Sequence, residues 1–238
     1  MGNRTAAELV NDFKKLATGL ERDVKRYEAK VAAIEKSQAD YAALEAALKA
    51  AIADRANLTA DKVSELAAAA GTLTPQLVAA HDYVTQKTKT GSNKNIMANE
   101  PGWITEDVAK AKTAINAILS DLGKLAPAER DQAKRDMIGI MYPADMLLAN
   151  PELYNRALPD VWKDYAYGVA TRLKAIKDKP VDIIKHPEVL DKEKAAIDAL
   201  LKQLAAAYDQ AEKSRQKKGP PAPRMIRTLI PHMPYFHR

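Results

Sequence analysis

The feature that most constrains the fold is the stretch from Val10 to Ile52, which contains no proline and a single glycine. Apolar side chains recur through it at alternating steps of three and four, the spacing of one stripe on an α-helix. The stripe persists for about six heptads, which is typical of a coiled coil. At 1.5 Å per residue the helix is about 65 Å long. The sequence therefore predicts a long coiled-coil helix over residues 1–58, paired with another helix of this chain or of a second copy.

Two alternating lines of side chains make up the predicted coiled-coil seam. Its members are Phe13, Leu20, Val24, Tyr27, Val31, Ile34, Tyr41, Leu48 and Ile52. Gln38 and Glu45 fall on the same register, where polar side chains cost stability in a dry interface. Leu44 is placed to substitute for Glu45 through a local shift. We interpret this end of the stripe as packing against a less regular surface, and the alternative is that the polar residues set the register.

The middle of the chain is divided by turn residues. Residues 59–87 are predicted to form two short helices, with Thr59 as N-cap and Gly71 as the stop of the first, and Thr74-Pro75 as the start of the second. Residues 88–104 are polar and contain almost no apolar side chain before Ile96. Loops of this length are usually functional or disordered. We therefore expect an interaction loop or a disordered segment at 88–104.

The remaining residues, 105–217, are predicted to form a helical body. Helices are expected from Thr105, from Ala126-Pro127, over Pro159 to Lys177, and over Pro187 to about Lys217, the last being the natural partner for part of the first helix. No segment alternates with a period of two over a useful length. The predicted class is all-α, with a long N-terminal helix packed on or projecting from an irregular helical bundle and an extended C-terminal tail at 218–238.

The net charge of +6 is concentrated at the C-terminal end. Residues 1–212 contain 30 basic and 31 acidic side chains, whereas residues 213–238 contain seven basic side chains and no acid. Charge blocks at a terminus are usually interaction tails, and balanced charges are typical of ordinary helix surfaces. The basic isoelectric point therefore belongs to the tail, and the body gives no electrostatic reason to expect nucleic acid.

The tail combines a spacer with an apolar and basic end. The run Gly219-Pro220-Pro221-Ala222-Pro223 is a stiff extended spacer. The predicted partner-binding residues are Lys213, Arg215, Lys217, Lys218, Arg224, Ile226, Arg227, Leu229, Ile230, Tyr235 and Phe236. Disordered tails normally lack this much apolar surface, so we interpret the end as a docking peptide for a groove on another protein or on a second copy. The alternatives are a clasp for nucleic acid, a membrane-surface anchor, and packing on the chain's own body.

Several chemistries lack their characteristic residues. The chain has no cysteine, which excludes disulfides, cysteine-ligated zinc and thiol nucleophiles. Its glycines stand singly, so the glycine-rich phosphate loops and the nucleophile elbow are absent. No Glu-x-x-His pair occurs, and none of the four histidines lies four residues from another. We expect no catalytic residue, no cofactor and no metal site, although an active site assembled from distant residues is the competing hypothesis.

The sequence predicts neither a membrane span nor a signal peptide, because no apolar run approaches 18 residues and the N-terminus lacks an apolar region. The expected location is the cytoplasm or a virion. Taken together, the patterns predict a non-enzymatic structural or assembly protein of a larger complex, of the virion interior, scaffold or adaptor type. Its partner would be another protein or a second copy. The alternative is a nucleic-acid-associated protein that binds phosphates through the tail.

Overall fold

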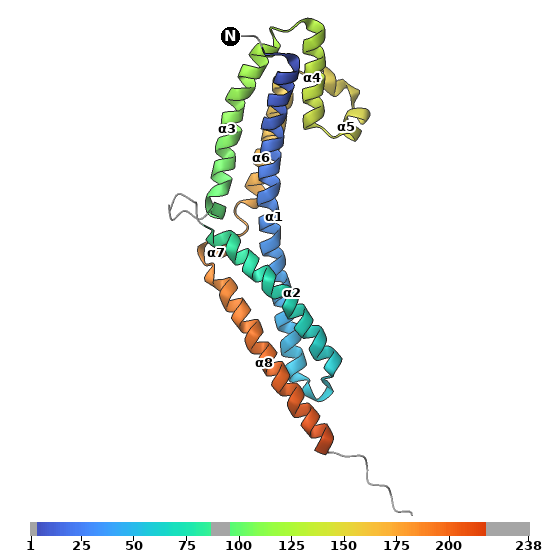
Figure 1. Ribbon diagram of the computed structural model, residues 1–238, viewed down its shortest axis with the longest axis vertical. Helices are drawn as coiled ribbons and strands as arrows, with labels where there is room; N and C mark the ends of the chain where they lie inside the picture. Colours follow the sequence, from blue (N-terminus) through green and yellow to red (C-terminus); the bar gives the residue numbers. More distant parts are fainter. Residues whose placement is uncertain (1–3, 87–95, 218–238) are drawn as a thin grey trace, which may run out of the picture.

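A computed structural model describes residues 4–86 and 96–217. Every regular element within these ranges is a helix, which confirms the predicted all-α class. Figure 1 shows an elongated molecule in which helix α1 (Ala6–Ala53) lies along the long axis and the other helices are arranged beside it. The 48 residues of α1 correspond to about 72 Å. One continuous helix therefore spans most of the molecule.

Both ends of α1 are fixed by local hydrogen bonds. Thr5 is the N-cap and forms a capping box with Glu8: the Glu8 amide donates to Thr5 Oγ1, and the Thr5 amide donates to the Glu8 carboxylate. At the other end a 3-10 turn, η1 (Arg55–Asn57), reverses the chain. Thr59 then caps α2 by accepting from the Lys62 amide, as the sequence predicts. The next helix consequently returns along α1.

The first half of α1 belongs to what we call the N-terminal bundle. Here α1 packs against α3 (Ile96–Leu122), α4 (Pro127–Met141) and α6 (Leu158–Ile176), while the short α5 (Ala144–Ala149) and η2 (Pro151–Asn155) connect α4 to α6. The core of this bundle contains large side chains, among them Phe13, Met137, Ile138 and Trp162. These helices cover the apolar side of α1 from Leu9 to Leu20.

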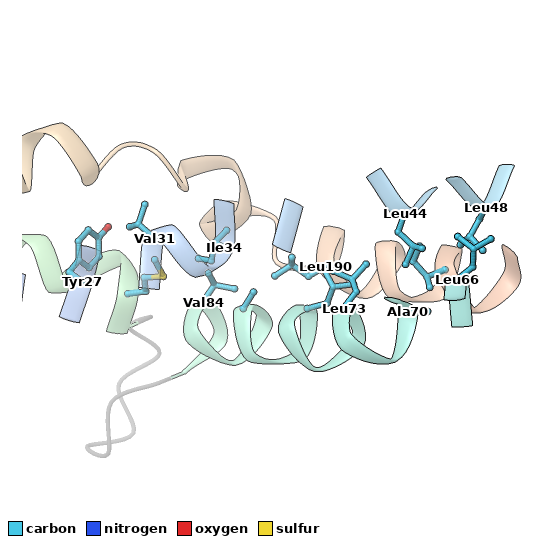
Figure 2. Packing of buried hydrophobic residues seen from close by; sticks show 14 of the residues in the cluster. Tyr27, Val31, Ile34, Leu44, Leu48, Leu66, Ala70, Leu73, Val84 and Leu190 are labelled. Atoms are coloured by element: carbon cyan, nitrogen blue, oxygen red, sulfur yellow. The ribbon is translucent and has the colours of Figure 1, made fainter. Parts of the chain in front are cut away.

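The second half of α1 belongs to the C-terminal bundle. Helices α2 (Ala60–Thr85) and α8 (Glu188–Lys217) lie beside it, and α7 (Val181–Lys185) adjoins the upper end of α8 (Figure 1). Figure 2 shows leucine, isoleucine and valine side chains from the three long helices meeting in one apolar layer, with Leu44 and Leu48 of α1 beside Leu66 of α2. The two bundles are thus placed end to end and share α1.

The prediction of two short helices over residues 59–87 is wrong, because α2 is one helix through Gly71 and Pro75. Proline in a helix interior removes one hydrogen bond. Pro75 itself lies on the exposed side of α2. The buried side chains continue without a break at helical spacing: Leu66, Ala70, Leu73, Leu77, Ala80 and Val84. Packing along this stripe offsets the lost bond, so the turn residues do not end the helix.

The predicted loop at 88–104 is also wrong over its second part. Residues 88–95 lie outside the described residues, but 96–104 form the first turns of α3, and Thr105 is inside that helix. The Ile96 amide donates to the Gln86 carbonyl at 2.9 Å, which brings the start of α3 to the end of α2. Met97, Glu100 and Ile104 are buried here. Long-range contacts therefore order a segment whose composition predicts a loop.

The later helices agree closely with the sequence pattern. Ala126-Pro127 starts α4, α6 covers Leu158–Ile176, and α8 covers Glu188–Lys217. Proline at the first helical positions of α4 and α6 has no amide to leave unpaired there, which explains why these starts are readable from sequence.

Candidate interaction surfaces

The predicted seam of α1 is covered by helices of the same chain. Seven of its members are buried, namely Phe13, Leu20, Val24, Tyr27, Val31, Ile34 and Leu48, and Tyr41 and Ile52 are half-buried. Ser37 and Leu44 are buried in place of Gln38 and Glu45, which is the local shift that the sequence suggests for Leu44. A second copy would have to displace α2, α3 or α8 to reach this stripe. Its role in association between copies stays a prediction.

Arg172 joins α6 to α1 by binding two carboxylates, Glu21 and Glu28, which lie on one face of α1. Its Nε and Nη2 donate to Glu28 at 3.0 and 2.6 Å, and its Nη1 donates to Glu21 at 2.8 Å. The hydrogen bonds with Glu28, followed by those with Glu21, raise the pKa of the Arg172 guanidinium. Nearby, the Tyr165 hydroxyl donates to the Ala17 carbonyl at 2.6 Å. Polar contacts beside the apolar stripe therefore help to orient α6 along α1.

A buried carboxylate lies where the two bundles meet. Glu100 of α3 is 2% exposed and accepts from Arg26 Nη2 and Lys30 Nζ of α1, each at 2.8 Å. Beside it the Tyr27 hydroxyl contacts the Lys177 carbonyl at 3.4 Å, and burial raises the pKa of Tyr27 to about 12. Burying a charge is costly unless it is paired. The two cations satisfy Glu100, so this group fixes the start of α3 on the middle of α1.

A second buried carboxylate, Glu193 of α8, lies inside the C-terminal bundle. It is 9% exposed and accepts from Gln38 Nε2 at 2.7 Å. Burial, with Glu45 as a further cause, raises the pKa of the Glu193 carboxyl, and the Gln38 hydrogen bond opposes this. Burial also raises the pKa of Tyr41, and Glu45 and Glu193 add to this effect. Gln38, at a polar seam position, thus serves as the partner of an acid on α8.

Three of the predicted partner-binding cations are part of the folded body. Lys213, Arg215 and Lys217 lie in the last turns of α8 and are exposed. Arg215 donates to the Leu58 carbonyl at 2.5 Å and to the Ala56 carbonyl at 3.2 Å. This side chain holds the end of α8 against the turn between α1 and α2. The predicted residues Lys218, Arg224, Ile226, Arg227, Leu229, Ile230, Tyr235 and Phe236 lie outside the described residues.

Open grooves line α1 and its neighbours, and the sequence analysis did not anticipate them. One of about 700 Å³ lies between the start of α1 and α4, one of about 550 Å³ lies between α3 and α6, and one of about 410 Å³ lies between α1 and α2. The first and third have alanine on both walls. Alanine at exposed helical positions is a weak signal in a sequence because it is also the best helix former.

Within residues 4–86 and 96–217 no group of three or more metal-ligating side chains comes together, and none of the helices there is long and apolar enough to cross a membrane. Nε2 of the half-buried His81 lies 3.4 Å from the carboxylate of Asp191 on α8, and Asp191 is exposed. Residue spacing along one helix does not indicate this pair. His186 lies beside Glu188 in the turn before α8. Both described histidines therefore have a local carboxylate partner.

Comparison with known proteins gave no match to a family model, a curated protein or a solved structure.

Proposed function

We propose that the chain is a non-enzymatic structural or assembly component of a larger complex, of the virion interior, scaffold or adaptor type. The elongated body separates two ends at a fixed distance, and the C-terminal tail docks on a protein partner. The working location is the cytoplasm or a virion.

The observation that carries this proposal is the continuous α1 shared by two bundles. A helix that is packed along about 72 Å resists bending, because each bundle holds a different part of the same hydrogen-bonded element. Spacer and scaffold components need such a fixed separation between attachment points.

The buried carboxylates support the same proposal. Buried acids beside a specific charge partner are candidates for acid–base chemistry. Glu100, however, is paired with Arg26 and Lys30, and Glu193 is hydrogen-bonded to Gln38. Each acid therefore has a structural partner across a helix interface.

The charge distribution favours one alternative, binding of nucleic acid through the tail. Residues 218–238 contain Lys218, Arg224, Arg227 and Arg238 and no acid. With four phosphate contacts, the logarithm of the binding constant falls with the logarithm of the salt concentration with a slope of about −3.6. Docking of apolar side chains depends far less on salt, so the two functions are separable by ionic strength.

The test is light scattering coupled to size-exclusion chromatography on the full chain and on a truncation after Lys217. Ending at Lys217 keeps the Arg215 contacts that hold α8, so loss of the tail is not confused with loss of the fold. We expect the full chain to be captured by its assembly partner, or to self-associate, and the truncation to remain a monomer. The proposal is wrong if both chains behave alike without nucleic acid and only the full chain binds it at low salt.

A further inference from the structure

The groove between α1 and α2 has features of an incomplete helix interface. It is formed by buried leucines at the base and exposed or half-buried alanines on the walls: Leu44, Leu66, Leu73, Ala43, Ala47 and Ala69. Small wall residues let another segment approach the leucines closely. The volume of about 410 Å³ is within the usual range for ligand sites.

A polar atom at the same groove lacks a partner. Gln76 contributes to the lining, and its Oε1 is buried without a hydrogen bond among the described residues. A buried acceptor without a donor destabilises the fold, because it has lost its hydrogen bonds with water. Because this oxygen has almost no exposed surface, a donor on a docked segment reaches it when the Gln76 side chain turns toward the groove.

We propose that residues 224–236 of the same chain occupy this groove. The segment places Met225, Ile226, Leu229 and Ile230 at steps of one, three and one, so its apolar residues recur with helical spacing. Arg224 and Arg227 supply hydrogen-bond donors at the intervening positions. Such a segment satisfies both needs of the groove, apolar cover and a donor.

The point where the described chain ends favours this occupant. Arg215 holds the end of α8 at Leu58, and the near end of the groove, at Lys62, is four residues or about 6 Å further along the chain. The spacer at 218–223 spans about 19 Å in the extended proline conformation. Because the linker is so short, the effective concentration of residues 224–236 at the groove is in the millimolar range.

The rims of the groove accept a basic segment at little cost. Asp40 of α1 pairs with Lys36, and Glu65 of α2 pairs with Lys62 at 2.9 Å, both on the exposed surface. Exposed pairs of this kind contribute little to stability. An incoming arginine can therefore exchange with either lysine.

The groove between α1 and α4 also has alanine walls but lies out of reach of this tail. It begins at Ala6, about 60 Å or more from the end of α1. Only the tail of a second copy could reach this more distant groove. The inference goes beyond the proposed function: in the free molecule the docking segment is held on its own body, and a partner must compete for it.

Because the chain has no cysteine, two introduced cysteines can report the contact. The variant Ala69→Cys with Thr228→Cys is treated with a short bismaleimide at low protein concentration, and the matched control is Ala128→Cys with Thr228→Cys on the distant alanine wall. We expect at least ten times more intramolecular cross-link in the first pair. Ala43→Arg, an exposed substitution on the facing wall, should lower that yield at least fivefold.

Equal yields in the two pairs would overturn the inference, as would no effect of Ala43→Arg. A cross-linked dimer in place of a cross-linked monomer would also overturn it and assign the groove to a second copy. The experiment uses the isolated full chain and needs no partner. A missing cross-link would therefore not contradict capture of a partner by the tail. A missing capture would likewise not contradict the cross-link.

Discussion

The two bundles share α1 but fill their cores differently. In the N-terminal bundle Phe13 and Trp162 meet edge to face with ring centroids 5.5 Å apart, and Trp162 lies at the same distance from Tyr165. In the C-terminal bundle the core is mostly leucine, isoleucine, valine and alanine, with Tyr27 and Met97 beside them and the buried polar residues Ser37 and Glu193. One half thus contains aromatic rings packed on one another, and the core of the other half is mostly aliphatic.

The difference follows from the helices available to each half. Helices α2 and α8, of 26 and 30 residues, run the length of the C-terminal bundle, and their buried side chains are mostly leucine and alanine. The N-terminal bundle combines the 27 residues of α3 with the shorter α4, α5 and α6, and the ring of Trp162 from α6 packs on Phe13 of α1. Similar apolar patterns on one helix can therefore support two kinds of packing.

The largest effect is expected from Trp162→Ala. Removing a buried aromatic side chain from a core lowers the free energy of unfolding by about 3–5 kcal/mol. Trp162 is 4% exposed and contacts both Phe13 and Tyr165. Urea denaturation would measure the loss, and amide hydrogen exchange should show faster opening in α4 and α6 than in α2 and α8. Equal acceleration in all four helices would mean that the bundles open as one unit and would contradict the comparison.

The matched control for Trp162→Ala is Tyr167→Ala on the same helix. Tyr167 is 74% exposed, and surface substitutions usually change stability by less than about 0.5 kcal/mol.

An intermediate effect is expected from Glu100→Gln at the junction of the bundles. The amide keeps the shape of the carboxylate but removes the charge that pairs with Arg26 and Lys30. Hydrogen bonds to charged groups contribute about 1.5–3 kcal/mol, so we expect a loss near 2 kcal/mol in urea denaturation. Glu106→Gln, on an exposed turn of α3, is the control. A loss no larger than that of the control would show that Glu100 does not fix α3 on α1.

The smallest effect, and one of opposite sign, is expected from Glu193→Gln in the C-terminal bundle. Because burial raises the pKa of Glu193, the folded state binds its proton more tightly than the unfolded state does. This contribution to stability is present at low pH and is lost as the pH rises from the ordinary glutamate range through the raised pKa. The neutral amide should therefore stabilise the protein at pH 7 by on the order of 1 kcal/mol.

Thermal unfolding of Glu193→Gln and of the parent chain at several pH values between 4 and 8 would measure this difference. The gain should shrink as the pH falls, because the parent carboxyl becomes protonated. A gain that is constant with pH, or a loss at pH 7, would contradict the assignment of Glu193 as a buried acid that opposes folding when charged.

Much of the fold follows from local patterns, and the exceptions have a common cause. The stripe on α1 and the starts of α4 and α6 are visible because helical spacing and proline at a first turn are local signals. The break predicted near Pro75 and the loop predicted before Thr105 fail because contacts with other helices decide those segments. Glu100 is the clearest example, since its partners lie 70 and 74 residues away on α1.

The candidate interaction surfaces were predictable only in part. Composition identifies the basic and apolar tail, but Arg215 belongs to the body because the Leu58 and Ala56 carbonyls at the turn after α1 accept from it, 157 and 159 residues away. The groove between α1 and α2 depends on the register between two helices. Exposed alanines such as Ala43 and Ala69 do not predict a groove from the sequence, because alanine is also the best helix former.

The central claim is that α1 continues as one helix through the junction of the two bundles. The most direct test is the distance between spin labels on Lys15→Cys and Ala46→Cys, exposed positions of α1 in the two bundles of a chain without other cysteines. A continuous helix predicts one narrow distribution near 46 Å along the axis. A broad distribution, or a clearly shorter separation, would show that the bundles move independently and would contradict the shared rigid helix.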